Sequence, residues 1–345
     1  MAFGNSGLFS SVAGNALLLL LTSLLLLIQC YLGDQNVYIC SGFVRSSVPI
    51  DFSKVSVRLL TLQGNLKYQT DYAQTGGYYM IPVYAKGVYV LRVKAPEGWN
   101  FEPEGVELRI DGETDPCSKG EHIIFNFSGF SLSGKVLVSE NDAQTVDCEV
   151  SLYDSNDQVL SSTKSVQGFF LFPAVLPGNY SIRLTDSNVC GKSVAVTIDL
   201  KSDSVPSSSL YVTGFSVQGK IKHSDIPSEV VTLLLYSEEN STVQDCDTRP
   251  LEKTGEALFK PKGFHYSCKI ESSPNGSYRF PCVGLGKHAI VPMYRKGLLT
   301  FQWEPKYSLA EVVNRPVIVE VLENEPFRVT GFAVQGSVLW NQKGK

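Results

Sequence analysis

Hydrophobic and polar residues alternate along short segments of this 345-residue chain, which is the pattern of β-strands that bury one face. The clearest segments are residues 54–60 (KVSVRLL), 148–154 (CEVSLYD) and 230–236 (VVTLLLY). Gly, Pro, Tyr and Phe are plentiful, whereas long helical runs of Ala, Leu, Glu and Lys are missing. The pattern therefore predicts an all-β protein.

A longer phrase, which we call the corner phrase, occurs three times without a gap. It reads GYYMIPVYAKGVYVL from Gly77, GFFLFPAVLPGNYSI from Gly168 and GSYRFPCVGLGKHAI from Gly276. The leading glycine permits a positive φ in a turn, and the apolar residues at steps of two bury one face of a strand. We expect the proline of each copy to end that strand, because proline cannot donate to a β-ladder.

A second phrase marks where each repeat begins. It reads CSGFV around Gly42, FSGFSLSGKV around Gly129, VTGFSVQGKI around Gly214 and VTGFAVQGSV around Gly331. Repeats of this size with short alternating strands predict a string of β-sandwiches with almost no linker, of the immunoglobulin-like or prealbumin-like kind. The predicted organisation is a signal peptide at 1–33, module 1 at 34–128, module 2 at 129–213, module 3 at 214–330 with an insert at about 238–264, and the start of a fourth module at 331–345.

The sequence stops early in this fourth module, where a strand start without a body cannot bury a core. We therefore expect the sequence to be the N-terminal piece of a longer protein, or an incomplete gene model.

The apolar run ALLLLLTSLLLLI at residues 16–28 has the length of a signal-peptide core and is short for a membrane span. Cleavage after Cys30 would place Ile28 and Cys30 at the −3 and −1 positions. The alternative is an uncleaved anchor. Both readings send the rest of the chain into the secretory lumen.

Seven cysteines follow the predicted signal peptide, and no pair has the C-x-x-C spacing of a zinc ribbon or a thioredoxin. In an oxidising lumen, disulfides are the expected state. Since the modules divide these cysteines two, two and three, we predict one disulfide within each module and a buried, inert thiol at Cys282. The predicted pairs are Cys40–Cys117, Cys148–Cys190 and Cys246–Cys268.

Four N-glycosylation sequons agree with the same compartment, at Asn126, Asn179, Asn240 and Asn275. Asn240 and Asn275 lie in polar, turn-like segments. Asn126 alternates with Phe125 and Phe127, so it should face outward if the two phenylalanines face the core.

Charge and motifs argue against other functions. The net charge is −4 with both signs mixed, which does not fit a nucleic-acid-binding surface. The GFSLSG and GFSVQG segments lack the spacing of a nucleophile elbow, and the acidic turn DGETDPC from Asp111 lacks the spacing of an EF-hand. The four histidines have no paired ligand spacing, and His288 replaces a tyrosine of the corner phrase, which suggests a packing or a surface role. We predict no catalytic, metal or cofactor site. Four aromatic residues could form a sugar-binding platform, but core or domain-junction packing is the simpler interpretation for most of them: Trp99, Phe101, Tyr294 and Trp303.

Taken together, the signal sequence, CSGFV, YYMIPVYAKGVYVLRVKAPEGWNFEP and the repeated TGFSVxG starts resemble the nodal modulator family. The most specific marks are KAPEGWNFEPEGVEL around Trp99, IPVY and KG around Tyr84, and Cys246, Cys268 and VPMYRKG before Phe301 in module 3. The resemblance covers essentially the whole mature chain. It implies a large single-pass endoplasmic reticulum protein with a lumenal string of immunoglobulin-like, prealbumin-like or carboxypeptidase-regulatory-like sandwiches.

The resemblance also implies partners. Members of the family act with nicalin and a small multipass protein beside the protein-conducting channel, in a complex that assists insertion of multipass membrane proteins. The family has also been tied to Nodal signalling and to the shape of the endoplasmic reticulum. The sequence ends before the positions of the family's further modules and C-terminal membrane span, so contacts made by those parts are not carried over.

The leading hypothesis is therefore a non-catalytic scaffold of the endoplasmic reticulum lumen, or, as an alternative location, a secreted protein. A second hypothesis is an array of carbohydrate- or peptide-binding sandwiches, which predicts an exposed aromatic row or a groove on one module. A third is an accessory region of an enzyme such as a carboxypeptidase, which predicts a zinc-binding catalytic domain elsewhere.

Overall fold

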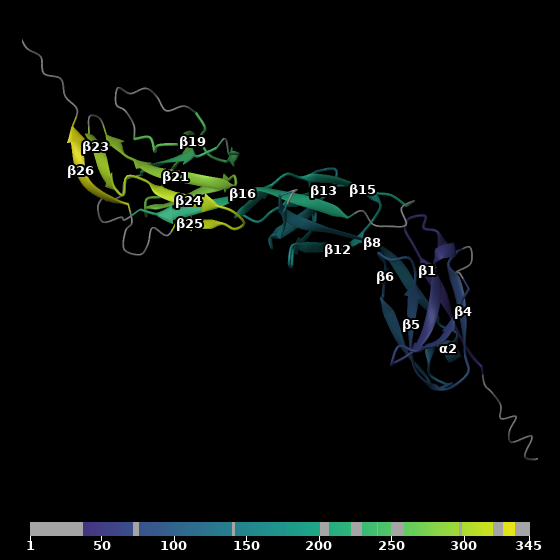
Figure 1. Ribbon diagram of the computed structural model, residues 1–345. Coiled ribbons are helices and arrows are strands. Elements are labelled where there is room, and N and C mark those ends of the chain that lie inside the picture. The colour runs from purple at the N-terminus through teal and green to yellow at the C-terminus, as the bar shows by residue number, and fades with distance from the viewer. Residues whose placement is uncertain are drawn as a thin grey trace, which may run out of the picture. The chain divides into compact units, whose positions relative to one another are not determined.

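The computed structural model describes residues 37–71, 76–139, 142–200, 207–221, 230–239, 241–249, 259–296, 299–319 and 327–334. The predicted signal peptide and the sequon at Asn240 lie outside these ranges. The described chain is almost entirely β-structure, which confirms the predicted fold class (Figure 1). It forms two compact units that divide between Ser128 and Gly129, so one unit holds module 1 and the other holds modules 2 and 3.

Module 1 is a sandwich of two sheets. One sheet has the strand order β3-β2-β5-β7, and the other contains β4, β1 and the start of β8. Helix α2 (Pro116–Lys119) and a short 3-10 helix (Phe52–Lys54) join the strands. The strands are β1 (Tyr38–Arg45), β2 (Ser56–Thr61), β3 (Leu66–Gln69), β4 (Tyr78–Val83), β5 (Gly87–Lys94), β6 (Trp99–Glu102), β7 (Gly105–Ile110) and β8 (His122–Ser139).

Modules 2 and 3 repeat this plan, with outer sheets ordered β11-β10-β13-β15 and β19-β17-β21-β24. The strands of module 2 are β9 (Asp142–Thr145), β10 (Glu149–Tyr153), β11 (Val159–Lys164), β12 (Phe169–Val175), β13 (Gly178–Leu184), β14 (Val189–Gly191), β15 (Val194–Ile198) and β16 (Ser208–Lys220). Those that follow are β17 (Thr232–Ser237), β18 (Val243–Gln244), β19 (His265–Glu271), β20 (Ser277–Val283), β21 (Gly286–Met293), β22 (Arg295–Lys296), β23 (Leu299–Glu304), β24 (Ser308–Val312), β25 (Val317–Val319) and β26 (Arg328–Val334).

The strand that closes one module continues as the strand that opens the next. In module 1, β1 pairs in parallel with the first part of β8, from Ser41 opposite His122 to Arg45 opposite Asn126. In module 2, the second part of β8 pairs in parallel with the first part of β16. In module 3, the second part of β16 pairs in parallel with β25. Strand sharing explains why the sequence contains almost no linker between repeats.

The three leading glycines of the corner phrase have the same conformation. Gly77, Gly168 and Gly276 have φ of 76°, 76° and 80°, a region that L side chains rarely adopt. Each glycine carbonyl accepts a hydrogen bond from the opening strand of its module, from Val44, Val136 and Ile221 at 2.8, 2.8 and 2.9 Å. The predicted corner therefore recurs as one structural unit.

Two details of the repeat differ from expectation. The aromatic residue two positions after each leading glycine lies opposite a glycine of the opening strand. The pairs are Gly42–Tyr79, Gly134–Phe170 and Gly219–Tyr278. Gly42 is thus equivalent to Gly134 and Gly219, and the sequence alignment of Gly42 with Gly129 and Gly214 was wrong. The alignment was based on the recurring Gly-Phe dipeptide. The structure instead requires a residue without a side chain at the position beneath the aromatic ring.

The prolines do not end their strands. Pro82, Pro173 and Pro281 all lie inside β4, β12 and β20. Strands β4 and β12 each pair with one neighbour only in the described structure, so they are edge strands. An edge strand tolerates proline because the missing amide need not reach a second neighbour.

The core of each module follows the predicted alternation. In module 1 the buried set includes Val57, Leu59, Tyr79, Ile81 and Phe125. The equivalent corner residues Phe170 and Phe172 in module 2 and Tyr278 and Phe280 in module 3 are at most 3% exposed. No helix among the described residues combines the length and apolar character needed to cross a membrane.

Candidate interaction sites

Disulfide bonds set the first constraint on how the modules are held. Cys40 of β1 bonds Cys117 of α2, and Cys246 bonds Cys268 of β19, as the sequence predicts. The predicted Cys148–Cys190 bond is wrong, because Cys190 of β14 bonds Cys282 of β20. Cys282 is therefore not a free thiol. Cys148 is the free, buried cysteine of the described structure, and burial raises the pKa of its thiol to about 11.

The pairing error has a structural cause. Strand β14 of module 2 pairs with β16, the strand that opens module 3, with Cys190 opposite Gly214. A Cβ on Gly214 would lie 2.3 Å from the Val283 carbonyl oxygen of β20, so the glycine allows close approach of that strand. Cys190 thereby comes beside Cys282 and away from Cys148, which precedes β10 in the other sheet. Counting cysteines per module assumed that no strand crosses a module boundary.

Hydrogen bonds reinforce the contact between modules 2 and 3. The Ser216 amide donates to the Asn188 carbonyl at 2.9 Å, and the Ser216 hydroxyl donates to the Asn188 side-chain oxygen at 2.9 Å. The Arg279 guanidinium of β20 donates to the Ser187 carbonyl and, at 3.3 Å, to the Asn188 side chain. The disulfide and these bonds together explain why modules 2 and 3 form a single compact unit.

The predicted insert forms a strap across one open side of module 3. We call residues 241–249 the strap. The Gly284 amide donates to the Thr242 carbonyl at 2.8 Å, and Val243 and Gln244 pair with Val283 and Cys282 as strand β18. The strap then crosses to the other sheet, where Cys246 bonds Cys268.

Beyond this bond, Asp247 fixes the end of the strap to β19. Asp247 and Lys269 exchange backbone hydrogen bonds of 3.0 and 2.9 Å, and the Asp247 carboxylate lies 3.5 Å from the Lys269 ammonium. The Tyr266 hydroxyl donates to the carbonyls of Asp247 and Arg249. The strap therefore joins the edges of both sheets, β20 on one side and β19 on the other.

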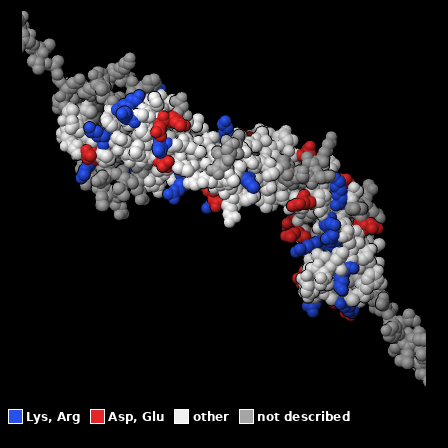
Figure 2. Space-filling model, viewed as in Figure 1, with Lys and Arg blue, Asp and Glu red and all other residues white. Residues whose placement is uncertain are grey.

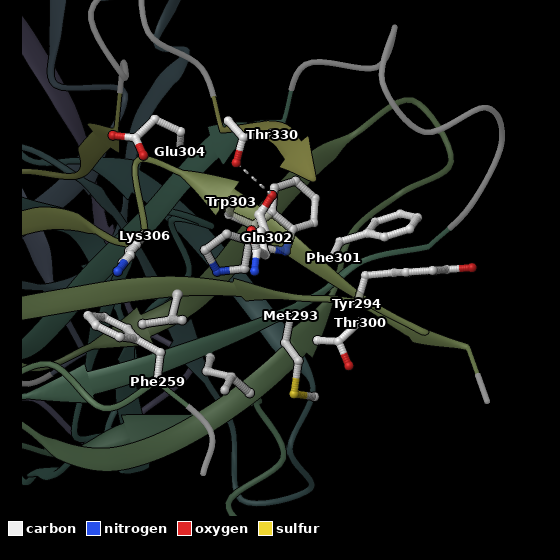
Figure 3. Close-up of a pocket in the computed structure, with 13 residues that line it drawn as sticks. Phe259, Met293, Tyr294, Thr300, Phe301, Gln302, Trp303, Glu304, Lys306 and Thr330 are labelled. Carbon is white, nitrogen blue, oxygen red and sulfur yellow. Dashed lines mark hydrogen bonds between the residues drawn. The ribbon is translucent and has the colours of Figure 1, made fainter. Parts of the chain in front are cut away.

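A pocket of about 530 Å³ lies at the far end of module 3, and aromatic side chains form much of its wall (Figure 3). Tyr294 stacks on Phe301 with ring centroids 4.3 Å apart, and Phe301 also contacts Trp303 and Phe332. The Trp303 side chain is buried, and its indole N–H has no acceptor among the described residues. Gln302, Glu304 and Lys306 add polar groups to the rim.

The structure brings two of the four predicted platform residues together and separates them from the others. Tyr294 and Trp303 line this pocket, whereas Trp99 and Phe101 pack against Phe127 in module 1, with ring centroids 5.5 Å apart in both pairs. Trp99 and Phe101 are thus packing residues. A pocket with stacked rings and with Gln302, Glu304 and Lys306 in its lining can hold an apolar or sugar-like group.

His288 takes over a structural role that tyrosine plays in the other modules. The Tyr89 and Tyr180 hydroxyls donate to carbonyls four residues earlier, those of Ala85 and Leu176, at 3.0 and 2.7 Å. At the same position, His288 Nε2 lies 2.9 Å from the Gly284 carbonyl, and its Nδ1 lies 2.9 Å from the Ser237 hydroxyl. The ring is fully buried, and desolvation lowers its pKa. The expectation of a packing role agrees with this placement.

The acidic turn is a helix cap. The Asp111 carboxylate accepts from the Thr114 hydroxyl and from the amides of Glu113 and Thr114, which lower its pKa. Asp115 is buried; burial acts to raise its pKa, but hydrogen bonds from Ser118 and Gly112 outweigh that effect and lower it. Asp115 caps α2 and so positions Cys117 for its disulfide. Across the described residues, no group of three His, Cys, Asp or Glu could hold a metal ion.

Three of the four sequons lie on the surface. Asn126, Asn179 and Asn275 are all exposed, and Asn126 lies between buried Phe125 and Phe127 in β8.

Positive and negative side chains are mixed over the face of the molecule seen in Figure 2, in agreement with the net charge of −4. Sequence reasoning missed the strap's contacts and the contact between modules 2 and 3. One signal was available in the sequence: the similar segments WNFEP from Trp99 and FQWEP from Phe301. They form the equivalent strands β6 and β23, which follow the corner phrase in modules 1 and 3.

Comparison with known proteins supports the repeat organisation. Residues 41–125 match the family model for the first β-sandwich domain of BOS complex subunit NOMO1-like proteins, and residues 127–213 match the model for the second. The second match ends where the sequence analysis ended module 2.

Relatives extend the similarity into module 3. The chain is 34% identical over 322 residues to BOS complex subunit NOMO1 of Mus musculus, which covers 91% of the chain and 26% of the relative. It is 35% identical over 320 residues to BOS complex subunit NOMO3 of Homo sapiens, covering 90% and 26%. It is 30% identical over 276 residues to nicotinic receptor-associated protein 4 of Caenorhabditis elegans, covering 78% and 24%. The chain spans about a quarter of the length of these relatives.

Proposed function

The chain belongs to the nodal modulator family, and on that premise we propose that it is a non-catalytic scaffold in the lumen of the endoplasmic reticulum. Its role is to hold protein partners within a BOS complex that contains nicalin and a small multipass membrane protein. This complex acts beside the protein-conducting channel and assists insertion of multipass membrane proteins.

The observation that carries the proposal is the similarity to BOS complex subunits, which runs through all three modules at 34–35% identity. The structure adds a physical reason for a scaffold role. Modules 2 and 3 share β16 and are joined by the Cys190–Cys282 bond, so a partner bound to one module is held at a set distance from the other. A protein that positions partners needs this kind of fixed spacing.

The proposed location rests on the disulfides and the sequons. Three disulfides require an oxidising compartment, and three exposed sequons are accessible to the glycosylation machinery there. Sensitivity of the cellular protein to endoglycosidase H, with protection from added protease in intact microsomes, is the expected result. Release into the medium with mature glycans would instead indicate the alternative, a secreted protein.

The test of complex membership is affinity purification of the tagged protein from membranes solubilised with a mild detergent. We expect nicalin, the small multipass subunit and channel subunits to be recovered. A matched preparation from cells that express the untagged protein shows which proteins are recovered non-specifically. Recovery of none of these partners with the intact protein would refute the proposal.

A second candidate function is carbohydrate binding at the aromatic pocket of module 3. The favouring observation is the Tyr294–Phe301 stack in a pocket whose lining also includes Gln302, Glu304 and Lys306, since sugar rings bind on aromatic faces beside polar groups. Binding to a panel of high-mannose glycans, measured for the chain and for Phe301→Ala, tests it. Binding that the substitution abolishes would favour this function, and absence of binding would remove it.

A further inference from the structure

A groove of about 150 Å³ lies at the open side of module 1, between the edge strands β3 and β4. It is lined by Lys67 and Tyr68 on one side and by Pro82, Val83, Tyr84 and Ala85 on the other. A space of this size accommodates one large side chain. Tyr84 is 60% exposed at its rim, so the groove opens to solvent.

This groove occupies the place that the strap fills in module 3. Strand pairing places Tyr68 opposite Leu59, which is opposite Leu91, and places Cys268 opposite Leu235, which is opposite Ile290. Leu91 and Ile290 are the same position of the corner phrase, so Tyr68 and Cys268 are equivalent. By the same phrase, Val83, Tyr84 and Ala85 are equivalent to Cys282, Val283 and Gly284.

The equivalent residues in module 3 are those that hold the strap. Gly284 donates its amide to Thr242, Val283 and Cys282 pair with Val243 and Gln244, and Cys268 bonds Cys246. Module 3 therefore contains an extended peptide segment lying across the same two edges. Its presence shows what kind of occupant this side of the sandwich accepts: a short β-strand with backbone pairing to one sheet and side-chain contacts to the other.

Among the described residues of module 1, no segment crosses the equivalent site as the strap does in module 3. In module 3 the strap comes from the long connection between β17 and β19, whereas β2 and β3 are joined by residues 62–65 alone. The amide of Ala85, equivalent to the one that binds Thr242, has no acceptor among the described residues. An exposed edge of this type is a template for pairing with another chain.

Charge identifies the occupant further. The strap carries Asp245, Asp247 and Arg249, for a net charge of −1; the Asp247 carboxylate lies 2.7 Å from the Arg249 guanidinium and 3.5 Å from the Lys269 ammonium of the neighbouring strand. In module 1 the groove lining contains one cation, Lys67, and no carboxylate. An acidic segment is thus complementary to both sites.

We propose that the β3–β4 groove of module 1 binds an extended, acidic peptide segment of a partner protein, which pairs with the edge of β4 as the strap pairs with β20. This site goes beyond the scaffold role, because it assigns a docking position and a ligand chemistry. It does not depend on membership in a BOS complex, so its test can fail while the scaffold proposal stands.

The test uses the chain's own strap as a probe. A fluorescent peptide of residues 241–248, with serine in place of Cys246, is titrated with the whole mature chain and followed by fluorescence anisotropy. We expect saturable binding with Kd below about 1 mM, a range typical of single short strands. Replacing both aspartates of the peptide with lysine should weaken binding by at least about threefold, the size expected for surface charges.

Variants of the chain locate the site. Lys67→Glu and Tyr84→Ala should each weaken binding by about three- to tenfold, whereas Lys94→Glu, at an exposed lysine of β5 outside the groove lining, should leave it unchanged. A photoreactive residue in place of Val243 of the peptide should crosslink to the 82–85 segment. No saturable binding, or binding that neither groove variant reduces, would overturn the proposal.

A second copy of the chain is the competing occupant. Sedimentation velocity across a range of chain concentrations separates the two cases. We expect a monomer whose sedimentation does not depend on Tyr84. Concentration-dependent dimers that Tyr84→Ala abolishes would overturn the assignment to a partner peptide.

Discussion

Modules 1 and 3 contain the same corner and the same sheet order, and differ in their disulfides and in what lies across one side of the sandwich. Gly77 and Gly276 share one conformation, and the residues that follow them bury the same face. The disulfide of module 1 joins Cys40 and Cys117 within the module. In module 3, Cys282 of the corner phrase instead forms a disulfide with Cys190 of module 2. No segment among the described residues covers the β3–β4 side of module 1, whereas the strap covers the equivalent side of module 3.

The comparison separates two kinds of sequence information. Residues that recur at fixed steps specify the sandwich, because every copy must bury the same face and turn at the same point. Residues that occur in one copy specify what the module does with its neighbours. The single-copy features are therefore the places to look for function in a repeat protein.

Breaking the two large disulfides should give the largest effects and should separate the modules. Both bonds close long segments, with sequence separations of 77 and 92 residues, so each should contribute about 4 kcal/mol. Replacing Cys190 and Cys282 with alanine should split the cooperative unfolding of modules 2 and 3 into two transitions in differential scanning calorimetry. Replacing Cys40 and Cys117 with alanine should lower only the transition of module 1.

The matched control is Cys148→Ala, which removes a buried thiol that forms no disulfide. It should lower stability by about 1 kcal/mol through lost packing and leave the number of transitions unchanged. If the Cys190 and Cys282 variant still unfolds in one transition, the shared strand and the hydrogen bonds are enough to couple modules 2 and 3, and the disulfide is not needed for it.

The shared corner can be tested by adding one methyl group. A Cβ on Gly77 would lie 1.9 Å from the Val44 carbonyl oxygen, and one on Gly276 would lie 2.6 Å from the Ile221 carbonyl oxygen. Both glycines also have positive φ. Gly77→Ala should therefore cost about 3 kcal/mol, and Gly276→Ala should cost somewhat less, measured by urea denaturation.

Gly64 provides the control for backbone strain alone. Its φ is 84°, and a Cβ there would meet no atom within 4 Å. Gly64→Ala should cost about 1 kcal/mol. Equal costs for Gly64→Ala and Gly77→Ala would show that the close approach of Gly77 to the opening strand does not matter for stability. That close approach would then not explain why a glycine recurs at this position.

The sequence was sufficient for the features that repeat. Alternation predicted the strands, and the gapless corner phrase predicted three equivalent turns, because period-two burial and positive-φ glycines leave direct marks. It also located the insert, since β17 ends at Ser237 and β19 begins at His265, and it gave the disulfide pairs within modules 1 and 3.

The sequence was insufficient where a strand leaves its own module. Cys190 was assigned to Cys148 because both lie in module 2, but β14 pairs with β16 of the next repeat. The sequence showed the strap only as part of an insert that lengthens module 3. Nothing in it indicated that Thr242 and Gln244 would pair with β20. Pairing between strands that are far apart in the sequence depends on which sheet edges are free. The alternation of hydrophobic and polar residues within one strand does not show which strand will pair with it.

Removing the cap of α2 should weaken module 1 by a smaller amount. Asp115 accepts hydrogen bonds of 2.8 Å from the Ser118 and Gly112 amides and holds the turn that carries Cys117. Asp115→Ala should cost about 1–2 kcal/mol in urea denaturation of module 1, and Glu113→Ala, at an exposed neighbour, should cost less than about 0.5 kcal/mol. The transition of modules 2 and 3 should not move, because Asp115 and Cys117 lie in the other unit. Equal effects of the two substitutions would show that the cap does not support the disulfide.

The smallest predicted effect distinguishes His288 of module 3 from Tyr89 of module 1. Burial lowers the pKa of His288 below its ordinary 6.5, so the unfolded chain binds a proton that the folded module excludes. Module 3 should be most stable above pH 6.5 and should lose stability as the pH falls from 6.5 toward the lowered pKa. His288→Gln keeps a donor for the Gly284 carbonyl without a titrating ring, and it should flatten the pH profile of module 3 between pH 5 and 7, a range chosen about the histidine pKa. Melting curves over this range provide the measurement, with the module 1 transition as internal reference. A module 3 profile that stays unchanged in His288→Gln would show that another group carries the pH dependence and that the ring's burial has no consequence for stability.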